Sequence, residues 1–230
     1  GQTLLPDASP DGTTIAAIHG NTDGFNRCPH TNWYFLPWHR AYLVMLERII
    51  RSMTNDPNFA MPYWDWTADR QLPRAFSDAT FDGRPNPLFA QRSMRPNASL
   101  PDDMVGPVVI DSILAEPNFE IFGTSRPRGQ DSLSEAWVTG GGGESGPLEA
   151  NPHNRIHGRV GGDMGDSNSA IDPIFWMHHC NIDRIWAVWN QQGNQNTTDA
   201  LWLDNQTGQT MGGLGVPGRT VKQNGVTVDD

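Results

Sequence analysis

The sequence has very little lysine: Lys222 is the only one, so arginine supplies nearly all of the positive charge. The 230 residues carry 16 basic and 26 acidic side chains, a formal net charge of −10. Without a basic patch, the chain lacks the electrostatic signature of proteins that bind nucleic acids or anionic membranes. No apolar run approaches the roughly 20 residues that a membrane-spanning helix needs. We therefore expect neither nucleic acid nor a membrane among its partners.

Cysteine is also scarce. Cys28 and Cys180 are too few to form a disulfide scaffold. The sequence begins at Gly1 without a signal peptide or a Met, which leaves secretion or periplasmic export after processing, and a cytoplasmic location, all open. The length suits one domain over residues 1–230, with an N-terminal arm at 1–12 and a C-terminal tail at 191–230 packed on or near it. Nothing in the sequence indicates an oligomeric state.

Apolar residues recur at three- and four-residue steps in two long stretches. They predict a helix from Pro37 that ends by Asn55, and another over 173–190 with Asp172 as its N-cap and Pro173 in its first turn. Shorter helices are predicted over 13–19, 108–114 and 151–160, and residues 67–107 read as a long covering loop. The predicted fold is mainly α: an antiparallel four-helix bundle with its site in the middle, long loops and a few short strands.

The chain has seven histidines in an early and a late set: His19, His30 and His39, then His153, His157, His178 and His179. His153 and His157 are four apart, so both face one way along a helix. Adjacent helical residues point about 100° apart, so only one of His178 and His179 can join the same site directly. Three plus three neutral imidazoles would hold two metal ions, of which copper, zinc or nickel suit such ligands better than magnesium or calcium.

Two other metal sites are excluded by the residues around these histidines. None has Glu three residues before it, which a di-iron carboxylate bundle requires. The His-Glu-x-x-His pattern of zinc proteases is absent as well. A lone histidine is more often a structural residue than a ligand, but three separate segments with ligand-like spacing favour a metal centre.

Four motifs carry a resemblance to a known family. Residues 28–40 read Cys-Pro-His-Thr-Asn-Trp-Tyr-Phe-Leu-Pro-Trp-His-Arg, which resembles the CuA motif of the tyrosinase and catechol oxidase family of type-3 copper proteins. Residues 152–157 and 172–186 resemble its CuB motif, and Tyr-Trp-Asp-Trp at 63–66 resembles its structural motif between the two. The resemblance covers roughly residues 13–70 and 145–190. It implies two copper ions, CuA and CuB, with dioxygen as co-substrate.

The resemblance also implies a role for each histidine. It implies CuA ligands His19, His30 and His39, and CuB ligands His153, His157 and His179. His178 would be an outer-shell or structural residue, with Phe175 as a packing ring and Asp183 as an acceptor that orients His179. Related fungal enzymes link a cysteine to a ligand histidine, so a Cys28–His30 thioether is weighed against a free thiol.

The family hydroxylates monophenols ortho to the OH group and oxidises o-diphenols to o-quinones, so small tyrosine- or catechol-like phenols are the implied substrates. Glu149 and Asn154 resemble the pair that holds a water near CuB to take the phenol proton; Glu144 is a weaker alternative, and an N-terminal helix carboxylate is the structural reading of Glu149. We hypothesise a true monophenolase. The alternatives are a catechol oxidase without hydroxylase activity and a non-enzymatic, hemocyanin-like oxygen carrier, for whose covering domain the chain has no room.

Overall fold

The computed structural model describes residue 19 and residues 28–127, 144–204, 221–222 and 225–226. The predicted arm at 1–12, the predicted helix over 13–19 except for His19, and most of the predicted tail lie outside the described residues. Mainly helical structure is observed across the described residues, as predicted.

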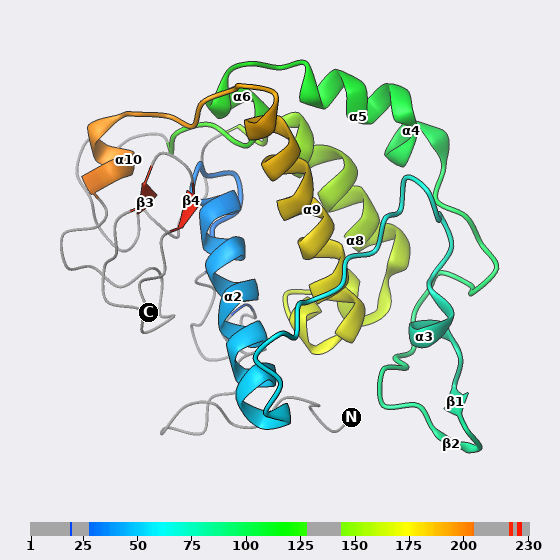
Figure 1. Ribbon diagram of the computed structural model, residues 1–230. Coiled ribbons are helices and arrows are strands. Elements are labelled where there is room, and N and C mark those ends of the chain that lie inside the picture. Colours follow the sequence, from blue (N-terminus) through cyan, green and yellow to red (C-terminus); the bar gives the residue numbers. More distant parts are fainter. Residues whose placement is uncertain (1–18, 20–27, 128–143, 205–220, 223–224, 227–230) are drawn as a thin grey trace.

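Two long helices form the centre of the molecule. Helix α2 (Phe35–Thr54) and helix α9 (Pro173–Gln191) pack side by side and run in opposite directions (Figure 1). Both predicted helices are confirmed within two residues. Helix α2 ends at Asn55, which adopts a left-handed conformation, and the Asp172 side chain caps α9 by accepting the N–H of Ile174. Local capping chemistry therefore fixes where α2 ends and where α9 begins.

The segment before α9 departs from the prediction. A π-helical stretch, η1 (Glu149–Asn154), precedes α8 (Arg155–Val160), and Asn151 within it has an extended backbone. The Asn151–Pro152 peptide bond is cis. The predicted continuous helix over 151–160 is therefore wrong in its first turn, because the residue before a proline is disfavoured in helical conformation. Two 3-10 turns, η2 (Gly162–Gly165) and η3 (Ser169–Ile171), lead from α8 into α9.

Short elements fill the remaining described chain (Figure 1). Helices α4 (Asp102–Val105), α5 (Pro107–Leu114) and α6 (Phe119–Phe122) cross one end of the central helices, and α10 (Ala200–Asp204) follows α9. Helix α3 (Arg74–Ser77) precedes an antiparallel hairpin of β1 (Thr80–Phe81) and β2 (Arg84–Pro85), with Phe81 opposite Arg84. Strands β3 (Val221–Lys222) and β4 (Gly225–Val226) pair antiparallel near the C-terminus. Among the helices that the structure describes, none has both the length and the apolar character of a membrane span.

The core is rich in tryptophan. Every tryptophan among the described residues is buried, and six of them are almost completely inaccessible: Trp33, Trp38, Trp66, Trp186, Trp189 and Trp202. The predicted structural motif at 63–66 joins this core to α9, because the backbone N–H of Trp64 donates to the carbonyl oxygen of Met177. A backbone hydrogen bond and the contact of the Trp66 ring with His178 thus link this motif to the centre of α9.

Residues 67–107 are attached to α9 by a buried ion pair. The Arg92 guanidinium donates to both carboxylate oxygens of Asp172, at 2.7 and 2.6 Å, and the two side chains are only 2% and 0% exposed. Asp172 is also the cap of α9, so a single carboxylate fixes both the loop and the helix that carries the late histidines.

Candidate metal centre

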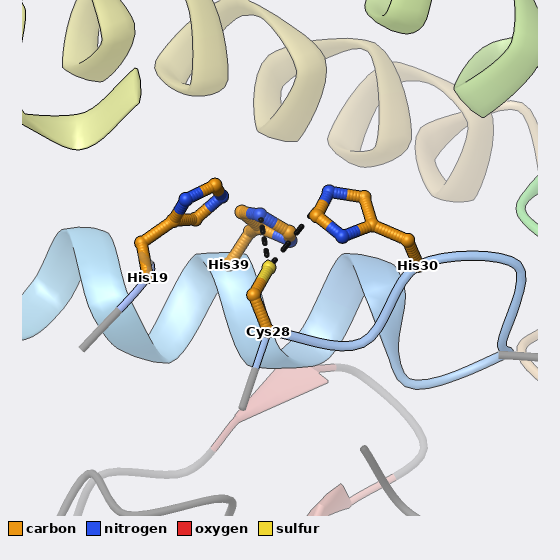
Figure 2. Close-up of side chains that lie close together, drawn as sticks. All are labelled: His19, Cys28, His30 and His39. Atoms are coloured by element: carbon orange, nitrogen blue, oxygen red, sulfur yellow. Dashed lines mark hydrogen bonds between the residues drawn. The ribbon is translucent and has the colours of Figure 1, made fainter. Parts of the chain in front are cut away.

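The early histidines meet at one point, together with a cysteine. His39 lies in the first turns of α2, and Cys28 and His30 lie on the loop that leads into this helix. One donor atom from each of His19, Cys28, His30 and His39 lies within 4.8 Å of the others. Figure 2 shows the ring of His39 between those of His19 and His30, with the Cys28 sulfur beside them. We call these four residues the early group.

The late histidines form a second cluster, the late group, from three elements. His153 lies in η1, His157 lies in α8, and the adjacent His178 and His179 lie in α9. One nitrogen from each again lies within 4.8 Å of the others. The two groups face each other directly, because the rings of His39 and His179 stack with centroids 4.3 Å apart and planes 6° apart.

Hydrogen bonds orient most of these rings. The Nδ1–H groups of His39 and His157 donate to the carbonyl oxygens of Phe35 and Met164, at 2.7 and 2.8 Å. His19 Nδ1 lies 3.2 Å from the carbonyl oxygen of Ser167. A ring that donates from Nδ1 carries its lone pair on Nε2, which is the arrangement of a metal-binding histidine whose other nitrogen is held by an oxygen.

Burial keeps the imidazoles neutral. Removal from water lowers the pKa of His30 and of His157 to about 4, and the pKa values of the other five histidines are lowered well below their usual range for the same reason. A neutral imidazole is the form that binds metal. The buried Nε2 atoms of His19 and His153 have no hydrogen-bond partner among the described residues, so each is an unused ligand atom.

The spacing of the nitrogens also suits a metal ion. The Nε2 atoms of His157 and His179 are 3.3 Å apart. Two nitrogens on one tetrahedral ion, each at roughly 2.0–2.1 Å, would be roughly 3.3 Å apart. The residues present therefore fit two metal ions, one at each group, and each group offers at least three imidazoles.

Phe175 lies between the two groups. Its ring centroid lies 4.7 Å from that of His19 and 4.2 Å from that of His179, so it packs against one histidine of each group. This contact limits how far either ring can rotate.

Asp183 makes a different contact from the predicted one. Its carboxylate accepts the Nε–H of Arg40 at 2.6 Å, and Arg40 stacks on Trp186. The Nδ1 atom of His179 has no hydrogen-bond partner among the described residues. Asp183 lies one turn beyond His179, but its carboxylate pairs with the Arg40 guanidinium. Asp183 therefore links α9 to α2 and does not orient the His179 imidazole.

His178 is completely buried beside the other late histidines. Its ring stacks on that of His153, with centroids 5.4 Å apart and planes 20° apart, and lies 6.3 Å from Trp66. Neither of its ring nitrogens has a hydrogen-bond partner within the described part of the chain. The structure brings a nitrogen of His178 as well as one of His179 into the late group, although only one of these neighbours was expected to join the site.

Glu149 and Asn154 lie at the two ends of η1. Asn154 Oδ1 lies 2.9 Å from Nδ1 of the preceding residue, His153. Glu149 is only 1% exposed; its Oε1 accepts the backbone N–H of Thr31 at 2.7 Å, and its other oxygen accepts the hydroxyl of Thr124. Burial raises the pKa of the Glu149 carboxyl, although the hydrogen bonds from Thr124 and Thr31 oppose the shift.

Sequence reasoning did not identify the donors to Glu149 or the partner of Asp172. Thr31 and Thr124 are 118 and 25 residues from Glu149, and Arg92 is 80 residues from Asp172. No local pattern links residues so far apart. The position of Thr31, directly after His30, was the one available signal that its backbone would lie at the site.

Two facing histidine groups within an antiparallel helix pair define a helical metalloprotein with a dinuclear centre. The family described as the common central domain of tyrosinase matches residues 12–136 and 110–192. The chain is 36% identical over 200 residues to tyrosinase HcTyr1 of Hahella sp. (strain CCB-MM4), a match that covers 80% of this chain and 42% of that one. It is 31% identical over 214 residues to a tyrosinase of Streptomyces antibioticus, covering 78% of this chain and 71% of that one.

A solved structure gives the same result. The fold matches active aurone synthase, a polyphenol oxidase whose description names copper B, with a TM-score of 0.63 and 26% identity over 87% of this chain and 68% of that one. The chain therefore belongs to the tyrosinase and polyphenol oxidase family of copper enzymes, which use two copper ions. It spans less than half the length of the Hahella relative.

Proposed function

We propose that this protein hydroxylates monophenols ortho to the OH group and oxidises o-diphenols to o-quinones, with dioxygen as the oxidant. The observation that carries the proposal is the position of Glu149. Glu149 is the first residue of η1, which also contains His153. Its buried carboxylate accepts a hydrogen bond from the backbone N–H of Thr31, the residue after His30. A carboxylate thus lies at the junction of the two histidine groups.

Six histidines hold the two copper ions in this proposal: His19, His30 and His39 in the early group, and His153, His157 and His179 in the late group. The copper ions supply the activation of dioxygen. The protein orients the imidazoles through the carbonyl oxygens of Phe35, Met164 and Ser167 and through the Asn154 side chain. Because these acceptors belong to four different segments, the ligand geometry depends on the folded chain.

Glu149 and Asn154 prepare the substrate. A free phenol has a pKa of about 10, so little phenolate exists at neutral pH. Glu149 and Asn154 hold a water molecule that accepts the phenol proton. The hydrogen bond between Asn154 and His153 keeps the Asn154 amide beside the late group. The raised pKa of the Glu149 carboxyl makes it a stronger proton acceptor than an exposed glutamate.

We further propose that substrates reach the late group past Gly158, which follows His157. A Cβ atom built on Gly158 would meet no other atom within 4 Å. This open space supports small and bulky phenols alike as substrates.

The thioether between Cys28 and His30 stays a prediction. The Cys28 sulfur lies 3.9 Å from Nε2 of His30. Formation of the bond would remove one hydrogen from each residue, with dioxygen as the oxidant.

Glu149→Gln tests the proposal. We expect the turnover of tyrosine to fall by at least about tenfold relative to the turnover of catechol, since a positioned proton acceptor contributes about 10²–10⁴-fold. Glu144→Gln is the matched control, because Glu144 is exposed and lies outside η1. Tyrosine and catechol oxidation are measured separately on copper-loaded protein.

Three results contradict the proposal. An equal loss of both activities in Glu149→Gln removes the proton-accepting role. Catechol turnover by the parent protein without tyrosine turnover identifies a catechol oxidase. Reversible dioxygen binding without turnover of either substrate identifies an oxygen carrier.

A further inference from the structure

We propose that Cys28, while it is a free thiol, completes a closed four-ligand site with His19, His30 and His39 that holds Zn²⁺. The inference rests on the proposed function only in taking the three early histidines as metal ligands. It concerns the chain before any bond forms between Cys28 and His30.

The distances around the sulfur fit this site. The Cys28 Sγ atom is 3.1 Å from Nε2 of His39 and 3.9 Å from Nε2 of His30 (Figure 2). On a tetrahedral zinc ion, with Zn–S of about 2.3 Å and Zn–N of about 2.0–2.1 Å, each sulfur–nitrogen distance would be about 3.5 Å. The two observed values lie on either side of it, so a shift of about 0.4 Å in each brings both sulfur–nitrogen distances to the required spacing.

A fourth donor is already aimed into the cluster. Nε2 of His19 is buried without a hydrogen-bond partner among the described residues, in a side chain that is 5% exposed. Its Nδ1 is held by the Ser167 carbonyl oxygen, so the unpartnered nitrogen carries the lone pair. Cys28 itself is 3% exposed, which keeps water from competing for the fourth position.

The chemistry of this donor set suits zinc. One thiolate and three imidazoles match the ligand types of structural zinc sites, which are tetrahedral and leave no position open. The metal replaces the thiol proton of Cys28, the proton passes to the solvent, and no electron is transferred. A catalytic metal must keep an open position for its substrates, so zinc in this site holds the early group closed.

The late group provides an internal comparison. It contains four histidines and no cysteine, and the other cysteine of the chain, Cys180, is part of neither group. A metal ion with a thiolate ligand therefore reports on the early group alone. Cys180→Ser is a matched control for Cys28→Ser, because it removes a thiol of the same chain without touching a metal-binding cluster.

The test uses the full chain, produced without copper and freed of metal with a chelator. Co²⁺ is the probe, because it accepts the same tetrahedral ligands as zinc and absorbs light. We expect an intense thiolate-to-cobalt charge-transfer band in the parent protein and in Cys180→Ser, and no such band in Cys28→Ser. Outer-shell changes cost about 10–100-fold in metal affinity, so loss of a direct ligand should weaken Zn²⁺ binding at the early group by more than about 100-fold.

The outcomes separate this inference from the proposed function. Cobalt bound to the parent protein without a thiolate band, or a Cys28 that is not a titratable thiol in copper-free protein, overturns the inference and leaves the histidine ligands standing. Failure of both Co²⁺ and copper to bind in the early group overturns the inference together with the proposed ligands. If Cys28→Ser does not fold, the thiolate band of the parent protein decides the question alone.

Discussion

Replacing Arg92 with methionine is expected to cost a large part of the stability of this protein. The substitution keeps an unbranched side chain but leaves the Asp172 carboxylate as a buried charge without its cation. Among the residues that the structure describes, only the N–H of Ile174, at 3.0 Å, would still donate to it. Removal of one partner from a buried ion pair costs about 3–5 kcal/mol, against a total stability of about 5–15 kcal/mol for a typical protein.

A double-mutant cycle isolates the ion pair from simple loss of packing. Asp172→Asn alone keeps a good N-cap but leaves the Arg92 guanidinium buried without its partner. The double variant Arg92→Met/Asp172→Asn has neither charge. We therefore expect its loss in the free energy of unfolding to be smaller, by at least about 2 kcal/mol, than the sum of the losses in the two single variants. Arg74→Met is the control, because Arg74 and Asp78 form an exposed pair with side chains 91% and 45% accessible, for which a loss of less than about 1 kcal/mol is expected.

The free energy of unfolding is measured by urea titration of copper-free protein, followed by the near-ultraviolet circular dichroism of the buried tryptophans. Copper must be absent, because a ligand that binds only the folded state adds its own stabilisation. A loss of less than about 1 kcal/mol in Arg92→Met, or additive effects in the cycle, would refute the assignment of this ion pair as the tether between the 67–107 segment and α9.

Three further predictions concern the site. His179→Ala should halve the copper content measured by mass spectrometry, whereas His178→Ala should leave it unchanged; equal losses contradict the choice between the two neighbours. Gly158→Ala should stabilise the protein by about 0.5–1 kcal/mol in urea titration, because the position is helical, exposed and sterically free; a loss would show that the added methyl group does meet a neighbour. Burial raises the pKa of Glu149 in the folded state. Above that pKa the buried carboxylate is ionised and lowers the free energy of unfolding, whereas below the pKa of glutamate in the unfolded chain this loss of stability is absent. The stability of Glu149→Gln relative to the parent should therefore increase as the pH rises from about 4, the pKa of an unfolded glutamate, to the raised pKa of the folded state, and a constant difference contradicts the shift.

The parts of the fold that were predictable from the sequence depend on local chemistry. Helices α2 and α9 follow from apolar spacing, and the start of α9 follows from Asp172 and Pro173, because a cap and its helix are neighbours in the chain. The hairpin of β1 and β2 had an equally local signal in Asp82-Gly83. Both residues have positive φ, as a tight hairpin turn requires, yet the surrounding proline-rich composition led us to predict only a loop.

The arrangement of the site could be predicted only in part. The histidine motifs indicated which residues to group, but not which oxygens hold their Nδ1 atoms. Asp183 shows the limit: its spacing from His179 suits a helical pair, but Arg40 of α2 reaches it first. A charged partner from another helix outweighs a neutral imidazole on the same helix, because a hydrogen bond between ions is the stronger one.

One difference among the proposed ligands follows from these contacts. His39, His153 and His157 each have Nδ1 held by an oxygen at 2.7–2.9 Å, whereas Nδ1 of His179 has no such partner among the described residues. The orientation of His179 therefore depends on packing against Phe175 and His39, and so on where α9 lies relative to α2. Two ion pairs set that position: Arg40 with Asp183 between the helices, and Arg92 with Asp172 at the start of α9. Weakening either pair should loosen His179 before it loosens His39, His153 or His157, since those three rings are held by hydrogen bonds of their own.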